Sequence, residues 1–378
     1  MSVTTNMRKI MILANDTTYT YNLRDVLIKR FINAEYKVVV ACECLNYEKE
    51  MLALGVRLIN IKMNRHSKNP FSDILLLTQF IKVLRKEKPS VVLTYNIKPN
   101  VYGGMACKML GIPYIPNITG LGTAVENAGI MQKISTILYK IGVSKAVCVM
   151  FQNESNQKYF VDNNLLGKNS LMCLLPGSGV NIEKFTCQPY PAQDSTITFS
   201  IIGRIMKDKG TDELIEAIKI VKSKYPEVLF KLIGYFDDNY QHIVEKAVDD
   251  GLLEYVKEQK DVRPLIIESW AVIQPSHHEG MSNTLLESAA SGRPVIATDI
   301  PGCRETFDSG KSGFAFPAGN SKVLAETIQR FIVMPYSEKQ RMGLAGRAKM
   351  EQEFDRNIVA QAYLSEISKT EKENNETL

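Results

Sequence analysis

Two cations near the middle of the chain lie where a loop could grip an anion. Arg204 follows Gly203 directly after an apolar run, 197–202, and Lys209 precedes Gly210 and a helical pattern. Open α/β sheets bind ligands at the carboxyl ends of their strands. Arg offers a planar fork of donors and Lys a compact charge, and this pair suits a diphosphate. A solvated loop with two ordinary surface charges is the alternative.

A second group, residues 279–287, combines two carboxylates with the start of a helix. It reads Glu-Gly-Met-Ser-Asn-Thr-Leu-Leu-Glu and follows an apolar run at 271–274. Such a turn exposes unpaired N–H groups at a helix N-terminus, where the helix dipole favours anions. Glu279 precedes the helix and Glu287 is expected about two turns inside it. Together they suit a ligand with hydroxyls and phosphate, such as a sugar nucleotide; singly, each could be an ordinary surface charge.

Short apolar runs alternate with helical periodicity along the chain, which predicts parallel sheets covered on both faces. The expected strands are 7–14, 37–41, 57–61, 91–94, 114–118, 146–152, 171–175, 197–202, 228–233, 271–274 and 294–297. The expected helices include 21–33, 73–85, 102–110, 211–222, one that opens near Ser282, and 357–368. We therefore predict an α/β fold with two doubly wound, Rossmann-like domains that face each other across a cleft.

The polar stretch 189–195, which carries two prolines, is the predicted linker between the domains. We place an N-terminal domain at 1–190, a C-terminal domain at 191–360, and a helix end with a polar tail at 361–378. The length of 378 residues fits two domains of ordinary size.

The net charge of +5 hides an asymmetry between the two halves of the chain. Residues 1–190 hold 23 Lys and Arg against 12 Asp and Glu, whereas residues 191–378 hold 23 against 29. The basic half is expected to meet an anionic partner. Nucleic acid is not expected, because the basic residues are not interleaved with aromatic ones as in a binding module. The chain also lacks the Gly-x-Gly-x-x-Gly pattern of dinucleotide oxidoreductases.

Part of the basic half, residues 57–88, holds eight Lys and Arg against Asp73 and Glu87. Its apolar residues are Phe71, Ile74, Leu75, Leu76, Leu77, Phe80, Ile81, Val83 and Leu84. The stretch could rest on an anionic membrane leaflet, or it could be a helix with a core face and a wet edge; for the helix itself we favour the second interpretation. No apolar run approaches the length that spans a bilayer and no leader is evident, so we expect a cytoplasmic protein, peripheral on the inner face of the cell membrane.

The spacing of these residues resembles the donor half of glycosyltransferase family 4, over about residues 196–360. The matching pieces are Gly203-Arg204, Lys209-Gly210, Pro275-Ser276, Glu279-Gly280, Leu286-Glu287, 292–299, 302–305 and Gly313. The amino half is similar to the bacterial branch that builds polysaccharide units on a polyprenyl diphosphate, through residues 94–103, 117–122 and 175–185. The resemblance implies the GT-B fold and a retaining enzyme that needs no metal and no other cofactor. The polar stretch at Asp237, Asp238 and Asn239 is accordingly expected to be exposed and not to bind metal.

The resemblance also implies a role for each matching residue. Arg204, Lys209 and Glu279 are assigned to catalysis: the two cations would hold the donor diphosphate, and the carboxylate would hold the donor sugar. The residues assigned to substrate binding are Gly203, Asp261, Val262, Arg263, Gly280, Met281, Ser282, Asn283, Thr284, Leu285, Glu287, Thr119 and Gly120. Within this group, Glu287 would hold the ribose and residues 261–263 would line the nucleobase. Thr119 stands where many family members carry a histidine, so Thr119 and Gly120 could contact the sugar or the acceptor.

From these observations we predict a glycosyltransferase. It would move a hexose or N-acetylhexosamine from a nucleotide sugar, most simply a UDP-sugar, to a polyprenyl-diphosphate-linked saccharide in surface polysaccharide assembly. The expected partners are the nucleotide-sugar donor, the lipid-diphosphate acceptor and an anionic membrane surface. Two alternatives stay open: an enzyme like the UDP-sugar 2-epimerases, which share the two-domain architecture, and a non-catalytic nucleotide-sugar-binding partner of an assembly complex.

Overall fold

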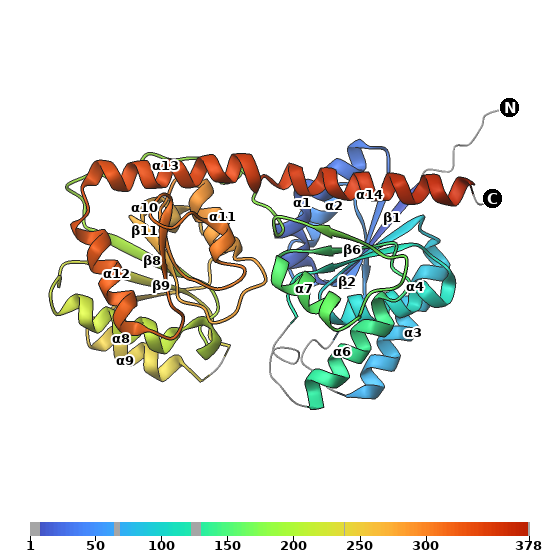
Figure 1. Cartoon of the computed structure of the whole chain (residues 1–378), viewed down its shortest axis with the longest axis horizontal. Helices are drawn as coiled ribbons and strands as arrows, with labels where there is room; N and C mark the ends of the chain where they lie inside the picture. The colour runs from blue at the N-terminus through green and yellow to red at the C-terminus, as the bar shows by residue number, and fades with distance from the viewer. Residues whose placement is uncertain (1–7, 64–68, 122–129, 238, 377–378) are drawn as a thin grey trace. The chain divides into compact units, whose positions relative to one another are not determined.

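The computed structural model describes residues 8–63, 69–121, 130–237 and 239–376. The chain divides into two compact units: residues up to 178 together with those from 356 onward form the first, and residues 179–355 form the second. Each unit contains a parallel β-sheet with helices on both of its faces (Figure 1). The predicted α/β class with two parallel-sheet domains is therefore confirmed.

The first unit is built on a sheet of seven described strands in the order β3-β2-β1-β4-β5-β6-β7. Its strands are β1 (Lys9–Asp16), β2 (Lys37–Glu43), β3 (Arg57–Asn60), β4 (Val91–Tyr95), β5 (Tyr114–Ile118), β6 (Cys148–Phe151) and β7 (Leu171–Leu174). Its helices are α1 (Thr17–Asn33), α2 (Glu48–Ala53), α3 (Pro70–Glu87), η1 (Pro99–Gly103), α4 (Gly104–Leu110), α6 (Ile130–Val143), α7 (Glu154–Asp162) and α14 (Arg356–Glu376). All seven strands predicted for this half are present.

Two hydrophobic cores hold this sheet, one on each face. Helices α3, α4, α6 and α7 bury residues such as Phe80 and Tyr139 against one face. Helices α1 and α14 bury residues such as Phe31 and Tyr363 against the other. Each helix that follows a strand begins at the carboxyl edge of the sheet, and asparagine or aspartate caps several of these starts; Asp16, for example, accepts a hydrogen bond from the N–H of Tyr19 at 2.8 Å.

The second unit has six described strands in the order β10-β9-β8-β11-β12-β13, all parallel. Its strands are β8 (Thr198–Ile202), β9 (Leu229–Gly234), β10 (Glu254–Lys257), β11 (Ala271–Gln274), β12 (Val295–Thr298) and β13 (Gly313–Phe316). Its helices are η2 (Lys207–Lys209), α8 (Thr211–Lys222), α9 (Gln241–Asp249), α10 (Arg263–Glu268), α11 (Asn283–Ala290), η3 (Arg304–Thr306), α12 (Ser321–Val333) and α13 (Tyr336–Glu353). The two strands that the sequence did not predict, β10 and β13, are the edge strands of this sheet.

The chain passes from one unit to the other at positions other than those expected from the sequence. The N–H of Val180 donates to the carbonyl oxygen of Phe354 at 2.8 Å, and Phe185 packs in one cluster with Met350 and Phe354. These contacts place residues 179–190 in the second unit. The boundary that we expected between residues 190 and 191 therefore lies inside this unit, beyond the point where the chain enters it.

The C-terminal stretch also differs from the expected helix end and polar tail at 361–378. Helix α14 belongs to the first unit and continues to Glu376. Arg356 pairs with Asp25 at 2.7 Å, and Glu371 pairs with Arg8 at 2.5 Å. Tyr363 and Ile367 of this helix are buried in the core beside the sheet, so the stretch is a packed helix and not a tail at these positions. None of the helices in the described ranges combines the length and the hydropathy that crossing a bilayer requires.

Candidate active site

The site residues of the second unit gather where its strand order reverses. Strands β8 and β11 are neighbours in the sheet but not in the chain, so the helices that follow them leave toward opposite faces. In such sheets this switch point opens a crevice at the carboxyl ends of the strands. Arg204 and Lys209 come from the loop after β8, and Glu279 comes from the loop after β11. Arg204, Lys209, Gln274 and Pro275 all line one hollow at this edge.

The Arg204 guanidinium stands at the mouth of this hollow. Its Nη1 lies 2.6 Å from Oδ2 of Asp237, and its side chain remains 41% exposed. The loop is fixed by close backbone packing, because a Cβ at Gly234 would lie 1.8 Å from the carbonyl oxygen of Gly203. Asp237 is exposed, as expected, but the sequence did not identify it as the partner of Arg204. A polar stretch after an apolar strand gave no signal for that pairing.

Lys209 lies deeper and meets Glu279. Its Nζ is 2.5 Å from Oε1 of Glu279, and the two side chains are only 18% and 14% exposed. The same carboxylate oxygen accepts hydrogen bonds from Gln274 Nε2 and Ser276 Oγ, both at 2.9 Å. This ion pair joins the loop after β8 to the loop after β11, and it holds the Lys209 ammonium beside the hollow.

Gly210 lets the two loops approach each other. Its φ is +72°, and a Cβ there would lie 2.1 Å from the carbonyl oxygen of Pro275. Below it, the N–H of His277 donates to the carbonyl of Asp208 at 2.9 Å, and His277 Nε2 lies 3.1 Å from Glu213 Oε1. His277 thus stabilises the packing of the two loops.

The turn at 280–283 opens α11 in the manner predicted. Ser282 caps the helix, and its Oγ accepts a hydrogen bond from the N–H of Leu285 at 3.3 Å. The turn packs closely on Gly302, where a Cβ would lie 2.7 Å from the carbonyl oxygen of Gly280. The side-chain oxygen of Asn283 is buried and has no hydrogen-bond partner within the described part of the chain. A hydroxyl or amide of a bound ligand would satisfy it.

The remaining residues of α11 divide between site and core. Thr284 donates from Oγ1 to the carbonyl of Ile202 at 3.3 Å, which ties the helix to the end of β8. Met281 and Leu285 are buried. Glu287 is half-buried and lies one helical turn from Asn283 on the same face, one turn closer to the helix start than expected. It can therefore face the same ligand as the turn.

Residues 261–263 form a separate, firmly held corner. The guanidinium of Arg263 binds Asp261 through Nε to Oδ1 at 2.8 Å and Nη2 to Oδ2 at 2.7 Å, and this pairing lowers the pKa of Asp261 and raises that of Arg263. Val262 packs in a cluster with Ile202 and Met281, so its loop lies against β8 and the α11 turn.

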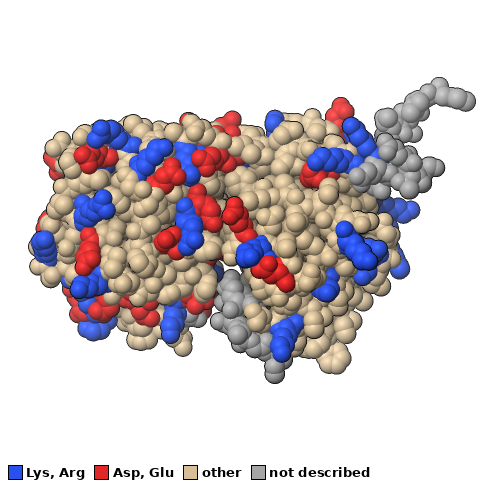
Figure 2. Space-filling model, in the orientation of Figure 1, with Lys and Arg blue, Asp and Glu red and all other residues tan. Residues whose placement is uncertain are grey.

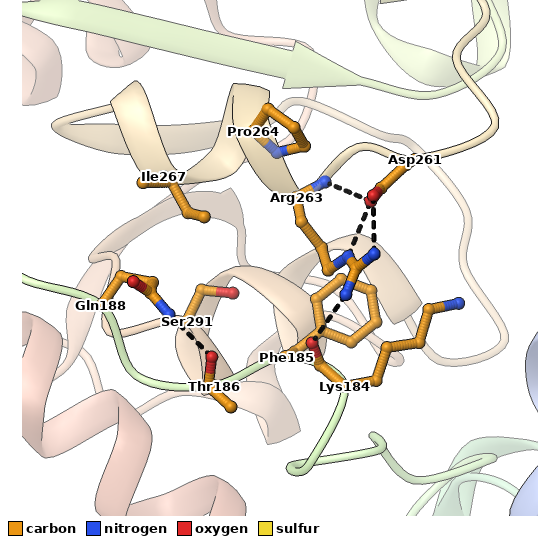
Figure 3. Close-up of a pocket in the computed structure, with 9 residues that line it drawn as sticks. All are labelled: Lys184, Phe185, Thr186, Gln188, Asp261, Arg263, Pro264, Ile267 and Ser291. Carbon is orange, nitrogen blue, oxygen red and sulfur yellow. Dashed lines mark hydrogen bonds and ion pairs between the residues drawn. The ribbon is translucent and has the colours of Figure 1, made fainter.

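This corner lines a cavity of about 230 Å³, whose other walls come from residues 184–188, α10 and the end of α11. Figure 3 shows Arg263 turned toward Asp261 across one side of this cavity, with Lys184 and Phe185 beside it. Lys184 and Phe185 were not singled out as ligand-facing residues, because a Lys-Phe pair in a loop has no distinctive spacing.

Thr119 and Gly120 lie in the first unit, directly after β5, and both are half-buried. Behind them a buried network joins Asn117 to Asn100, Gln152 and Tyr363. This network fixes the carboxyl end of β5, so the chain at 119–120 leaves the sheet from a rigid base. Among the residues that the structure describes, no group of three or more His, Cys, Asp or Glu side chains could hold a metal ion.

Comparisons with known proteins show which family the chain resembles. The family model described as "Glycosyl transferase 4-like" matches residues 9–153, and the one described as "Glycosyl transferases group 1" matches residues 185–349. An N,N'-diacetylbacillosaminyl-diphospho-undecaprenol alpha-1,3-N-acetylgalactosaminyltransferase of Campylobacter jejuni is 26% identical over 373 residues, which cover 94% of this chain and 97% of the relative. The capsular polysaccharide biosynthesis glycosyltransferase CapM of Staphylococcus aureus is 27% identical over 308 residues, with 76% and 79% covered.

Solved structures show the same architecture. HepE of Anabaena, in complex with UDP-glucose, matches with a TM-score of 0.77 and 17% identity over 96% of this chain and 99% of its own. Fold and relatives together define a glycosyltransferase of the GT-B fold. The chain belongs to glycosyltransferase family 4, in the branch that assembles polysaccharides, which confirms the resemblance seen in its motifs.

Proposed function

We propose that this enzyme transfers a hexose or N-acetylhexosamine from a UDP-sugar to a saccharide linked to a polyprenyl diphosphate, with retention of the anomeric configuration. The observation that carries the proposal is the hollow at the β8–β11 switch point, which Arg204 and Lys209 line, with Lys209 paired to Glu279 just before the capped turn of α11. Two cations and a helix N-terminus suit a diphosphate. The name of the Campylobacter relative describes an N-acetylgalactosaminyltransferase acting on a diphospho-undecaprenol, and HepE was solved with UDP-glucose.

In this proposal the donor diphosphate lies against Arg204 and Lys209, and Glu279 with the turn at 280–283 holds the donor sugar. Glu287 holds the ribose, and the loop at 261–263 lines the nucleobase. As the bond between the anomeric carbon and the phosphate oxygen breaks, negative charge grows on the departing UDP. The two fixed cations stabilise that charge, which is why we propose that no metal is required.

The acceptor hydroxyl attacks from the face that UDP leaves, and its proton passes to the departing phosphate oxygen. The new bond joins the anomeric carbon to the acceptor oxygen, so the configuration is retained without a covalent enzyme intermediate. We assign the acceptor to the first unit, because its residues, 1–178 and 356–378, carry 25 basic against 15 acidic residues and the acceptor is a lipid diphosphate. Thr119 and Gly120 are its proposed contacts, and the cytoplasmic face of the membrane is the proposed place of reaction.

The experiment that tests this proposal has two stages. A panel of UDP-sugars is screened for thermal stabilisation, and the stabilising donors are then offered with defined polyprenyl-diphosphate saccharides. Free UDP that is released only when an acceptor is present supports the transferase. Interconversion of the UDP-sugar without acceptor would indicate a 2-epimerase, and UDP binding without turnover would indicate a non-catalytic partner.

A matched pair of lysines links that assay to the site. Lys209 and Lys207 lie on the same short helix η2, but Lys209 pairs with Glu279 whereas Lys207 is exposed to solvent. Lys209→Ala is expected to slow transfer by about 100-fold or more, and Lys207→Ala by less than about threefold. Equal rates in the two variants would contradict the diphosphate assignment.

A further inference from the structure

Three helical segments of the first unit form one layer over a single face of its sheet. Two of the segments are α3 and α6, and the third is η1, which runs directly into α4. Helices α3 and α6 both pack against this third segment. Helix α3 follows β3 and α6 follows β5, so both begin on the side of the carboxyl ends of the parallel strands. The outward surfaces of α3 and α6 therefore reach the edge of the sheet where such folds bind their ligands.

The outward surface of α6 carries apolar side chains where water-facing helices carry polar ones. Ile134, Ile137 and Ile141 are all exposed, Ile137 to 58%, and their spacing of three and four residues places them on one stripe. The opposite stripe, which includes Tyr139 and Val143, is buried in the core. Helix α6 thus has an apolar face toward the sheet and a second one toward the outside.

The first half of α3 repeats this feature. Phe71 is 80% exposed, and Ile74 and Leu75 are both 59% exposed. The apolar residues of this stretch therefore divide: Leu76, Phe80 and Leu84 form the expected core face, whereas Phe71, Ile74 and Leu75 do not. A helix with one apolar face toward the core and a charged edge toward water explains Leu76, Phe80 and Leu84. It does not explain the exposed Phe71, Ile74 and Leu75.

The charges of this layer are of one sign. Its exposed cations are Lys82, Arg85, Lys86, Lys108, Lys133 and Lys140. Its two carboxylates within the described elements are both neutralised: Asp73 binds Lys98 and the hydroxyl of Tyr102, each at 2.8 Å, and Glu87 is buried against Lys9 and Arg57. The lower right of Figure 2, where Figure 1 places α3 and α6, shows tan and blue atoms.

We propose that the exposed faces of α3 and α6 form a lipid-docking face, through which the enzyme rests on an anionic bilayer. The apolar side chains Phe71, Ile74, Leu75, Ile134, Ile137 and Ile141 enter the boundary between headgroups and acyl chains. The surrounding lysines and arginines meet the anionic headgroups. A lipid surface fits better than a protein, because lysine is depleted in protein interfaces. The inference rests on the proposed function, in which the acceptor is held in a membrane.

Vesicle sedimentation with the full-length chain tests the lipid-docking face without donor or acceptor. Vesicles of 70% phosphatidylcholine and 30% phosphatidylglycerol are compared with vesicles of phosphatidylcholine alone. Wild type is expected to bind the anionic vesicles at least about tenfold more tightly. The double variant Ile134→Ser/Ile137→Ser is expected to bind them about tenfold or more weakly than wild type. The matched control Val333→Ser/Leu344→Ser, which changes two exposed apolar residues of the second unit, is expected to bind like wild type.

A charge-reversal variant tests the electrostatic contribution to vesicle binding. Lys133→Glu/Lys140→Glu is expected to weaken binding by about fivefold or more for each lysine. The control Lys158→Glu/Lys246→Glu is expected to bind like wild type.

Equal binding to both kinds of vesicle, or no difference between the variants and their controls, would overturn the proposal. So would a wild-type dimer in sedimentation velocity that Ile134→Ser/Ile137→Ser converts to monomer, because a second copy would then cover this face. Transfer to a water-soluble acceptor is measured in parallel; loss of vesicle binding with that rate retained separates this inference from the proposed function.

Discussion

Replacement of Glu279 by Gln removes one negative charge from a packed polar cluster and keeps its shape. In the structure Oε1 of Glu279 lies 2.5 Å from Lys209 Nζ and 2.9 Å from both Gln274 Nε2 and Ser276 Oγ. The side chains of Lys209 and Glu279 are 18% and 14% exposed, so water compensates little for the lost charge. The variant therefore leaves the Lys209 ammonium facing a neutral amide.

The size of the effect follows from the kind of hydrogen bond that changes. A hydrogen bond to a charged group contributes about 1.5–3 kcal/mol and a neutral one about 0.5–1.5 kcal/mol, so the exchange costs about 1–2 kcal/mol of unfolding free energy. For a folding unit of about 150–250 residues, each kcal/mol shifts Tm by about 2–4 °C. The Tm of the second unit is therefore expected to fall by about 2–8 °C. The loss of a positioned charge at the sugar is expected to lower kcat by about 100-fold or more.

Calorimetric melting, isothermal titration with UDP and initial transfer rates measure the three effects separately. UDP affinity is expected to stay within about threefold of wild type or to increase, because Lys209 no longer has a carboxylate that competes with the diphosphate. Glu351→Gln is the control: Glu351 pairs with Arg347 at 2.6 Å on α13, is 49% exposed, and belongs to the same unit. A fall in UDP affinity by the same factor as kcat would refute the reasoning, since it would place Glu279 at the nucleotide instead of the sugar.

Four further predictions follow from single residues. Arg204→Ala is expected to lower kcat/KM by about 100-fold or more, measured at saturating acceptor; a rate within about twofold of wild type would contradict it. Gly210→Ala forces a Cβ to 2.1 Å from the Pro275 carbonyl at φ +72°, and is expected to lower the urea midpoint through a loss of about 1–3 kcal/mol. Burial lowers the pKa of Lys339 below 10.5, so between that lowered value and 10.5 the unfolded chain binds more protons than the folded one. The stability of wild type relative to Lys339→Met is therefore expected to rise as the pH approaches 10.5, measured by urea titrations. Cys187 is exposed, so Cys187→Ser is expected to remove the fast phase of thiol labelling; an unchanged fast phase would contradict its placement.

The sequence predicted the sheets well because buried parallel strands are apolar throughout. An apolar run such as Val91–Thr94 predicts a central strand, and all the central strands of both units were predicted. The edge strands β10 and β13 of the second sheet were missed, whereas the edge strands β3 and β7 of the first sheet were predicted. Glu254–Lys257 holds only two apolar residues between two charged ones, and Gly313–Phe316 opens with a glycine, so neither forms a long apolar run.

That Arg204, Lys209 and Glu279 lie close together could be predicted from the sequence, but their contacts could not. The spacing of Arg204, Lys209 and Glu279 placed them at strand ends, and the strand order brings those ends together. That Asp237 would hold Arg204 depends on how the loop after β9 folds back, which no local pattern encodes. The unit boundary was misplaced for a similar reason: the prolines at 189 and 191 lie in an irregular segment inside the unit, whereas the packing of Phe185 on Phe354 decides where the unit begins.

The acidic composition of the second half does not oppose the binding of a diphosphate. Residues 191–378 hold 29 acidic against 23 basic residues, but the described carboxylates are largely exposed and act over about 8 Å at physiological salt. Arg204 and Lys209 instead act at contact distance, from a loop fixed by Gly210 and Gly234. Each already has a carboxylate partner, Asp237 or Glu279. An incoming diphosphate must share or displace these partners, so its affinity is a difference between two sets of ion pairs. In the proposed function, this exchange of ion pairs lets the site hold a UDP-sugar and still release UDP, which a repeated transfer requires.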